Sequence, residues 1–425
     1  MTIRGAILAV AIIVRAVPAA SDSDVAGRWV GTMQRGTATL AISIDIPAED
    51  PQHATFTARD VGAMDVPLRN VRVSSPEVSW DLVGDRTTTT FNGTLASDAI
   101  QGTFGEGDSR GVFSLRHRSR STERPYTAAD VVFVSGGVKL AGTVLSPRTR
   151  GRHPGIVFIH GSGPEGRWAN AVMADDLARH GIVALIYDKR GVGQSGGDWK
   201  TSSLEDLATD ARAAVHLMAA REDVDPARVG IYGHSQGGFI APMVADRNGE
   251  VAWIIDADGN VGPQYEQDLF RVGTALAKHY KGQELRDAMR LYGRFVEVAR
   301  NGEPHESFNR ERVKWQNAPW FRDLALPDDT DWIWSWYRRV GNDDNRAAWA
   351  AVRIPVLLLY GENDEIVPAR ASIAAIKKRL KGSVTVRVLK NADHTLHVPP
   401  TDPQGWPHYA PGLFTTVREW IMNHS

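Results

Sequence analysis

Cysteine is absent from this 425-residue sequence, and its absence excludes several kinds of chemistry at once. A chain without thiols forms no disulfide bonds, has no cysteine nucleophile and offers no thiolate ligand to a metal ion. An excess of charge of one sign is also lacking, because 49 basic residues balance 50 acidic ones and leave a formal net charge of −1. This balance gives no overall field that would attract nucleic acid or an anionic membrane, so neither is an expected partner.

Long hydrophobic runs are missing as well. The apolar stretch at residues 5–14 follows Arg4 and is too short to span a bilayer. Small residues follow at Ala19 and Ala20, and this succession is the pattern of a secretory signal peptide. We therefore expect residues 1–20 to be a signal peptide and the protein to be exported, periplasmic or secreted, with no stable membrane insertion. Arg15, directly after the apolar stretch, departs from the pattern, so an unprocessed N-terminal tail is the alternative.

The residues that are present have the mixture of a folded globular protein, with 42% hydrophobic and 23% charged residues. A chain of this length is expected to fold as about two or three units. Residues 24–118 contain short alternating segments separated by Gly, Pro, Asn and Asp, which predicts a small all-β accessory domain, either a sandwich or a barrel. Residues 119–128 are polar and contain Pro125, so they are expected to form a linker.

From residue 129 onward the pattern changes to apolar runs that alternate with helical periodicity. The runs lie at residues 155–160, 183–188, 229–233, 251–256, 355–360 and 384–389. Continuous runs of this kind suit parallel strands buried on both faces. Residues 129–425 are therefore expected to form an α/β domain with a doubly wound, mostly parallel sheet.

The alternation stops between about residues 262 and 351. This stretch has helical periodicity and holds six tryptophans. It predicts a helical cap inserted between two strands of the sheet, above the strand ends. The tryptophans either wall an apolar acyl pocket or simply pack the cap helices together, because tryptophan buries well in any core.

Ser235 lies in the sequence Gly-His-Ser-Gln-Gly-Gly at residues 233–238. A predicted strand precedes it and a helical pattern follows, which is the strand–turn–helix setting of a Gly-x-Ser-x-Gly nucleophile elbow. The glycines fit because the serine takes a strained conformation and the chain packs tightly on both sides. Such a turn lifts the hydroxyl out at the carboxyl edge of the sheet, where a ligand can reach it. We predict that Ser235 is a nucleophile; an ordinary glycine-rich turn is the alternative.

A serine hydroxyl needs a base to take its proton, and the base needs a group that orients it. Asp364 and His394 each follow a later predicted strand and give the expected chain order of nucleophile, acid and base. We predict that His394 is the general base and Asp364 the acid. Other candidates remain: Glu362, Glu365, Asp256 and Asp258 for the acid, and His397 and His160 for the base. His394 and His397 have the spacing of zinc ligands but no third ligand accompanies them, so no metal and no other cofactor is expected.

A second glycine-rich turn, Gly-Ser-Gly-Pro at residues 161–164, follows the predicted strand that ends at His160. Acyl transfer builds negative charge on the substrate oxygen, and each fixed N–H donor that stabilises it is worth about 3–4 kcal/mol of barrier. We expect the backbone N–H groups of Ser162 and Gln236 to form this oxyanion hole, with Gly163 as the alternative to Ser162. The glycine-rich loop at residues 187–197 is expected to support the catalytic face, because a phosphate site would need a helix start that is missing there.

Together these motifs resemble those of bacterial α/β hydrolases of the carboxylesterase and serine aminopeptidase-like kind. The resemblance covers the chain from about residue 130 onward, and the serine elbow is its most specific part. A signal peptide, a β-rich domain and then a hydrolase is also similar to the layout of exported EstD-type esterases. The resemblance implies hydrolysis of short-chain esters of small molecules, through an acyl-enzyme intermediate and without a cofactor. Residues 165–168, Glu-Gly-Arg-Trp, depart from the acidic segment often found there, so the acyl preference is not implied.

Other functions remain open from the sequence. The same three residues serve in peptidases, aminopeptidases and thioesterases. An aminopeptidase would need carboxylates that hold the substrate amine, and Glu266, Asp268 and Glu297 in the predicted cap are candidates. A non-enzymatic alternative makes the β-domain a surface-binding module attached to an inactive hydrolase, but the intact Ser-Asp-His series favours an enzyme.

Overall fold

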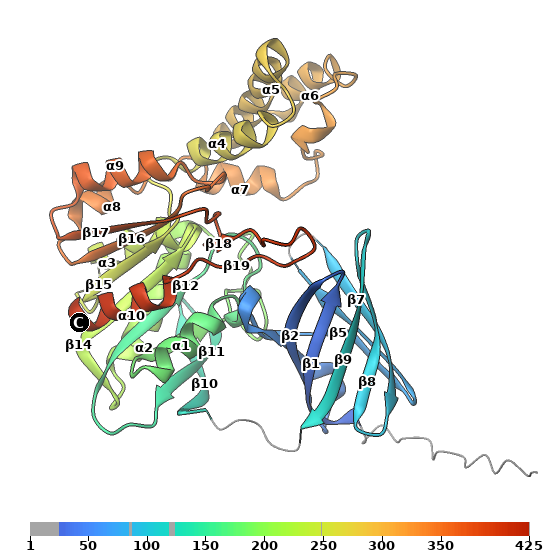
Figure 1. Cartoon of the computed structure of the whole chain (residues 1–425). Coiled ribbons are helices and arrows are strands. Elements are labelled where there is room, and N and C mark those ends of the chain that lie inside the picture. Colours follow the sequence, from blue (N-terminus) through green and yellow to red (C-terminus); the bar gives the residue numbers. More distant parts are fainter. Residues whose placement is uncertain (1–24, 85–86, 119–123, 248, 425) are drawn as a thin grey trace, which may run out of the picture. The chain divides into compact units, whose positions relative to one another are not determined.

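The computed structural model describes residues 25–84, 87–118, 124–247 and 249–424 (Figure 1). These residues divide into two compact units, one within residues 1–57 and 66–121 and the other within residues 58–65 and 122–425. The expected signal peptide, residues 1–20, lies outside the described residues. None of the helices in the described residues combines the length and the hydrophobicity that a membrane span requires.

The N-terminal part of the chain forms one sheet of nine strands in the order β4-β3-β2-β1-β9-β8-β7-β6-β5. Its strands are β1 (Gly27–Arg35), β2 (Ala38–Ile46), β3 (Thr55–Ala58), β4 (Ala63–Pro67), β5 (Arg69–Ser74), β6 (Glu77–Val83), β7 (Thr88–Ala96), β8 (Ala99–Glu106) and β9 (Ser109–Arg118), with short 3-10 turns at Pro51–His53 and Arg59–Val61. Neighbouring strands such as β1 and β2 pair in an antiparallel register. The predicted all-β region is therefore confirmed.

This sheet curves around a single aromatic core. In β7 every second side chain points inward, including Phe91, which is fully buried. The Phe91 ring packs on Trp80 of β6 at a centroid distance of 5.6 Å. It also lies 6.1 Å from Phe56 of β3, although four strands separate β3 from β7 in the sheet order. Contact across so many strands requires one strongly curved sheet rather than two stacked sheets.

The expected linker at residues 119–128 extends too far. Residues 126–128 begin strand β10 (Tyr126–Ser135) and pair with residues 145–147 of β11 (Val138–Pro147). Tyr126 is only 2% exposed, and its hydroxyl donates to the buried Asp175. The start of β10 could not be predicted from the polar composition around Pro125, because the pairing strand and the buried aspartate that stabilise it lie further along the chain.

The second unit contains an eight-stranded sheet in the order β10-β11-β13-β12-β14-β15-β16-β17. Its other strands are β12 (His153–Ile159), β13 (Val183–Tyr187), β14 (Val224–His234), β15 (Trp253–Ala257), β16 (Val356–Gly361) and β17 (Val384–Leu389). The first two strands of this order run antiparallel to their neighbours and the remaining pairs are parallel. The predicted doubly wound, mostly parallel sheet is confirmed.

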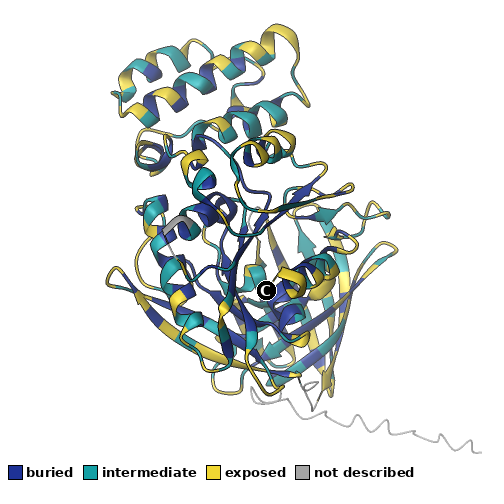
Figure 2. Ribbon diagram, turned by 90° about the vertical axis from the view of Figure 1, so that its left-hand side faces the viewer, coloured by how far each residue is buried: buried dark blue, intermediate teal, exposed yellow. Residues whose placement is uncertain are grey.

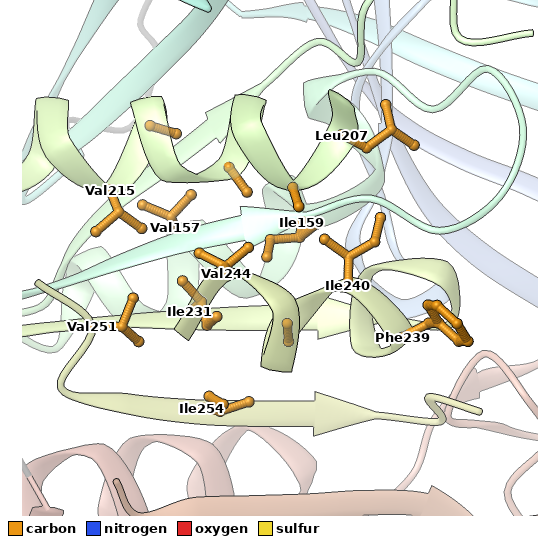
Figure 3. Packing of buried hydrophobic residues seen from close by; sticks show 14 of the residues in the cluster. Val157, Ile159, Leu207, Val215, Ile231, Phe239, Ile240, Val244, Val251 and Ile254 are labelled. Carbon is orange, nitrogen blue, oxygen red and sulfur yellow. The ribbon is translucent and has the colours of Figure 1, made fainter. Parts of the chain in front are cut away.

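Helices cover both faces of this sheet, which explains the continuous apolar runs. On one face, α2 (Leu204–Ala219), α3 (Gln236–Arg247), α8 (Arg346–Ala351) and α9 (Ala369–Arg379) enclose one core; on the other, α1 (Ala171–Arg179) and α10 (Leu413–His424) enclose a second. Val157 and Ile159 of β12 face α2 and α3 (Figure 3), whereas Ile156 and Phe158 face the opposite core. Since successive strand residues point to opposite faces, both sets must be apolar. Figure 2 accordingly shows these strands as buried.

A helical cap lies between β15 and β16. It comprises α4 (Gln264–Leu276), α5 (Gly282–Asn301), α6 (His305–Val313) and α7 (Ile333–Val340), with a 3-10 turn at Arg322–Leu324. The helices share their own core, where Phe295 of α5 contacts Trp334 of α7 at 4.9 Å between ring centroids. Trp334 and Trp320 are buried there, so these two tryptophans pack the cap rather than wall a pocket. The remaining short elements of the unit are a 3-10 turn at Arg167–Asn170 and the strands β18 (His397–Val398) and β19 (His408–Tyr409).

Candidate active site

Ser235 occupies the sharp turn between β14 and α3. Its φ angle is +53°, a left-handed conformation that is strained for a residue with a side chain. The turn demands glycine on both sides. A Cβ added to Gly233 would lie 2.2 Å from the Gly237 carbonyl oxygen, and one added to Gly237 would lie 2.3 Å from the Ile159 carbonyl oxygen. The sequence motif is therefore a true nucleophile elbow in geometry.

Ser235, His394 and Asp364 form one hydrogen-bonded chain. The Ser235 hydroxyl lies 2.9 Å from Nε2 of His394, and Nδ1 of His394 lies 2.9 Å from Oδ2 of Asp364. The Asp364 side chain is fully buried and that of His394 is 12% exposed. The second oxygen of Asp364 accepts the backbone N–H groups of Ile366 at 2.7 Å and Val367 at 2.8 Å. This arrangement holds the imidazole with Nδ1 protonated and Nε2 free to accept the serine proton.

The charge on Asp364 is stabilised at this position. Burial alone would raise its pKa, but the hydrogen bond and the charge of His394, with the Ile366 and Val367 N–H groups, bring the pKa below the ordinary aspartate value. Asp364 is thus ionised at neutral pH. An ionised carboxylate stabilises the imidazolium that forms when His394 takes a proton.

The alternative bases are engaged elsewhere. Nε2 of His160 lies 2.5 Å from the Tyr187 carbonyl oxygen, and burial lowers the pKa of His160 to about 4. His160 therefore stays neutral beneath the turn that follows β12. The Nδ1 atom of His397 lies 2.8 Å from the carbonyl oxygen of Thr395.

The alternative acids have different partners as well. Glu362 accepts the Asn391 N–H at 2.9 Å, and Glu365 pairs with Lys278, just after α4, at 2.5 Å. The Asp256 carboxyl accepts the hydroxyl of Tyr360 at 2.9 Å. None of these hydrogen bonds leads to His394.

Asp258 is the one alternative acid that lies next to the triad. Ligand atoms of Asp258, Asp364 and His394 are all within 4.8 Å of one another. Asp258 also accepts the Gly361 N–H at 2.8 Å. Burial, and then the negative charge of Asp364, raise the pKa of Asp258 well above the ordinary value. The raised pKa favours the protonated form of Asp258, which is placed to hydrogen-bond the ionised Asp364.

The expected oxyanion donors lie on two neighbouring segments. Ile159 at the end of β12 pairs with Gly233 of β14, so the turn after β12 and the elbow after β14 begin side by side at the carboxyl edge. The N–H of Gly161 is already used, because it donates to Glu165 at 2.7 Å. Within the described residues, the N–H groups of Ser162 and Gln236 donate to no protein acceptor. They are available to a substrate oxygen, and so is that of Gly163.

The charged run Asp188–Lys189–Arg190 after β13 gives each side chain a different partner. Asp188 accepts two hydrogen bonds from the guanidinium of Arg167, at 3.2 and 2.9 Å, and Arg190 binds Asp210 of α2 at 2.7 and 2.6 Å. The Lys189 ammonium donates to carbonyl oxygens of the turn after β12. The sequence indicated a supporting role for this loop but not these partners; three charges directly after a buried strand were the signal.

The cap is attached to the loop that carries the triad acid. Gln267 of α4 donates to the carbonyl oxygen of Ile366 at 3.0 Å, next to the Lys278–Glu365 ion pair. Of the three carboxylates proposed to hold a substrate amine, Glu266 accepts the Tyr265 hydroxyl at 3.4 Å, and the other two bind arginines inside the cap. Asp268 binds Arg271 at 2.6 Å, and Glu297 binds Arg294 at 2.8 Å.

Comparison with known proteins adds a family match. The family model described as "Serine aminopeptidase, S33" matches residues 152–401, which is more than half of the chain. The esterase EstD of Thermotoga maritima is 32% identical over 116 residues, covering 26% of this chain and 28% of that protein. The AB hydrolase superfamily protein YisY of Bacillus subtilis is 24% identical over 215 residues, covering 50% of this chain and 75% of that protein.

Two further matches have limited coverage or similarity. An uncharacterized protein of Mycobacterium tuberculosis is 31% identical over 137 residues, covering 32% of this chain and 47% of that protein. Among solved structures, Est1E of Butyrivibrio proteoclasticus with ferulic acid bound has a TM-score of 0.47 and 20% identity, covering 69% of this chain and 98% of that chain. The chain thus spans less than half the length of the EstD and Mycobacterium relatives.

Proposed function

This chain belongs to the serine aminopeptidase S33 family of α/β hydrolases, and from that premise we propose that it is a serine esterase acting on small carboxylic esters. The observation that supports the proposal is the hydrogen-bonded chain from the Ser235 hydroxyl through His394 to the buried Asp364. It lies at the carboxyl edge of the parallel sheet, where ligands of such folds bind.

The reaction proceeds in two acyl transfers. The Ser235 oxygen attacks the ester carbonyl carbon while its proton moves to Nε2 of His394. The N–H groups of Ser162 and Gln236 stabilise the resulting oxyanion. The tetrahedral intermediate collapses, and the alcohol leaves with the proton from His394. A water molecule then gives a proton to His394, attacks the acyl-enzyme and releases the carboxylic acid, which restores the Ser235 hydroxyl.

Two observations favour an ester over an aminoacyl amide. One relative bears the name esterase, over a short matched stretch. In addition, two of the three candidate anchors for a substrate amine, Asp268 and Glu297, already bind arginines. The amide-cleaving alternative keeps the same three residues and derives its support from the family name.

The first prediction concerns Ser235. Ser235→Ala removes the nucleophile and should reduce the turnover of p-nitrophenyl butyrate about a million-fold, which is the usual loss for such a nucleophile. The enzyme should also lose covalent labelling by a fluorophosphonate probe.

Ser162→Ala is the matched control, because the proposed role of Ser162 is that of its backbone N–H, which alanine keeps. Near-normal turnover by Ser235→Ala would remove Ser235 from the mechanism.

Comparing p-nitrophenyl esters with aminoacyl p-nitroanilides on the same enzyme separates the two substrate classes. Faster cleavage of the anilides at equal concentration would replace the esterase proposal by an aminopeptidase.

A further inference from the structure

Lys189 is a buried cation whose surroundings the proposed mechanism leaves unexplained. It is the second residue after β13 and is only 3% exposed. Its ammonium group donates to the carbonyl oxygens of Gly161 at 2.8 Å and Gly163 at 3.2 Å, and to Oε1 of Gln236 at 2.8 Å. An ammonium has three N–H donors, so these three acceptors use all of them.

These acceptors belong to the segments that carry the expected oxyanion donors. A peptide unit is planar and trans, so its C=O and N–H point in opposite directions. The carbonyl of Gly161 shares a peptide unit with the N–H of Ser162. When Lys189 holds that carbonyl on its own side, the Ser162 N–H is fixed facing away from Lys189. The same ammonium binds the side chain of Gln236, whose backbone N–H is the other donor, at the start of α3.

We propose that Lys189 is a positioning residue for ester hydrolysis, because it ties the turn after β12 to the start of α3 and so fixes the two oxyanion donors relative to each other. This inference rests on the proposed function. It assigns no contact between Lys189 and the substrate. The residue acts through the peptide unit of Gly161 and Ser162 and through Gln236.

The charges around Lys189 suit an ammonium that holds the two oxyanion segments rather than one that forms an ion pair. Its neighbours Asp188 and Arg190 each bind an oppositely charged side chain, whereas all three acceptors of Lys189 are neutral. Glu165 contributes an attractive charge, but its carboxylate accepts the Gly161 N–H on the same turn. The other neighbours are the Trp199 ring, 5.5 Å from Nζ, and the imidazole of His160, which is neutral above about pH 4.

This environment also predicts a pH dependence. Burial lowers the pKa of Lys189 from 10.5 to about 8, and the charge of Glu165 offsets the effect in part. As the pH rises through about 8, the folded enzyme therefore loses the ammonium proton. A neutral amine has two N–H donors for three acceptors, so kcat should fall on the alkaline side. This test uses the unmodified enzyme and needs no variant to fold.

The second prediction is tested by Lys189→Met, which keeps the length of the side chain but removes the charge and the donors. We expect kcat for p-nitrophenyl butyrate to fall about 10²–10³-fold, the usual loss for one oxyanion donor, with KM changed only a few-fold. The residual kcat should lack the alkaline fall near pH 8. Lys139→Met, at an exposed lysine of β11, is the matched control and should keep the wild-type kcat and pH profile.

Chemical rescue provides a readout that a purely structural role would not give. Because the chain has no cysteine, Lys189→Cys introduces the only thiol, and alkylation of the unfolded variant with 2-bromoethylamine gives a thioether analogue of lysine at this position alone. After refolding, the ammonium should restore most of kcat. Alkylation with iodoacetamide, which adds no charge, should not restore it.

Fluorophosphonate labelling separates a failure of this inference from a failure of the proposed function. If the wild-type enzyme is not labelled at Ser235, the proposed function fails. If the wild-type enzyme is labelled and Lys189→Met turns over ester at the wild-type rate, the proposal for Lys189 is overturned. The same conclusion follows if the wild-type profile is flat from pH 7 to 9.5, or if the charged and uncharged adducts have equal kcat.

Discussion

Two aspartates that follow different strands lie near the imidazole of His394, and their pKa values are shifted in opposite directions. Asp364 follows β16, binds Nδ1 of His394 and is ionised. Asp258 follows β15 and lies in the same buried group, where burial and the charge of Asp364 raise its pKa and disfavour a second carboxylate. The opposite pKa shifts therefore favour a single negative charge, on Asp364, beside the base.

The third prediction compares these two residues. Asp364→Asn should lower kcat about 10⁴-fold, because an amide at this position stabilises the wrong histidine tautomer and no imidazolium. Asp258→Asn should keep kcat within about tenfold, since an amide can still accept the Gly361 N–H and donate to Asp364. Steady-state kinetics on both variants measures the difference. The reverse order of the two effects would make Asp258 the acid of the triad.

At the scale of elements, the site depends on how closely the elbow packs against its neighbours. The turn after β12, the elbow after β14 and the first turn of α3 meet at the carboxyl edge of the sheet, where their backbones pack closely together. Buried Asn345, just before α8, links the same region to the end of the cap: it donates to the carbonyl oxygens of Phe239 at 3.1 Å and Asn260 at 2.9 Å. It also accepts the Gly262 N–H at 3.1 Å. The start and the end of the cap are thereby held beside α3.

The fourth prediction concerns the elbow glycine. In Gly233→Ala the new Cβ would meet backbone atoms of Gly237 at 2.2 Å and of Gly238 at 2.7 Å, and backbone cannot move aside as a side chain can. We expect a loss of about 1–3 kcal/mol in the free energy of unfolding, the usual cost of overpacking, together with loss of esterase turnover. Urea denaturation and the ester assay report the two effects.

Gly293→Ala is the matched control within α5. Apart from its chain neighbours and the backbone of α5 itself, no atom lies within 4 Å of the added Cβ, so alanine should stabilise the helix by about 0.5–1 kcal/mol and leave turnover unchanged. A Gly233→Ala variant with wild-type stability and turnover would show that the turn is less tightly packed than described.

At the scale of the whole molecule, stability is linked to pH through buried carboxyl groups. Asp256 is fully buried in β15, and burial raises its pKa from 3.8 to about 7, although the Tyr360 hydroxyl and the Gly259 N–H act in the opposite direction. Between about pH 4 and pH 7 the folded chain thus holds a proton that the unfolded chain has released. Asp256 therefore lowers the free energy of unfolding as the pH rises through this window, whereas the buried His160, with its pKa lowered to about 4, acts in the opposite direction. Asp364, with its lowered pKa, loses its contribution only below the window.

The fifth prediction follows from this linkage. Asp256→Asn removes the titration, so its free energy of unfolding relative to the wild type should increase steadily from pH 4 to pH 7. A pH-independent effect of the amide on the free energy of unfolding would shift all values equally and leave this trend unchanged. Urea denaturation of both proteins across this range measures the change, and a difference that stays constant with pH would contradict the raised pKa of Asp256.

The sequence by itself determined the features that depend on local patterns. Residues 155–159 had to be apolar throughout because helices cover both faces of β12, and this pattern alone predicted a buried parallel strand. The elbow at Ser235 could be predicted because its strain and close packing require glycines a few positions away. The order of Ser235, Asp364 and His394 along the chain was likewise visible, although several other acids and bases had comparable positions.

Only the tertiary structure decided between these alternatives, since the choice depends on distances between segments far apart in sequence. His394 rather than His160 faces Ser235, because His160 binds the carbonyl of Tyr187 beneath the turn. The start of β10 at Tyr126 likewise depends on pairing and on a buried partner that no local pattern contains. The same holds for Lys189, which the sequence shows only as a charge after a predicted strand. Its proposed role depends on three acceptors on two other segments, which the fold brings within hydrogen-bonding distance.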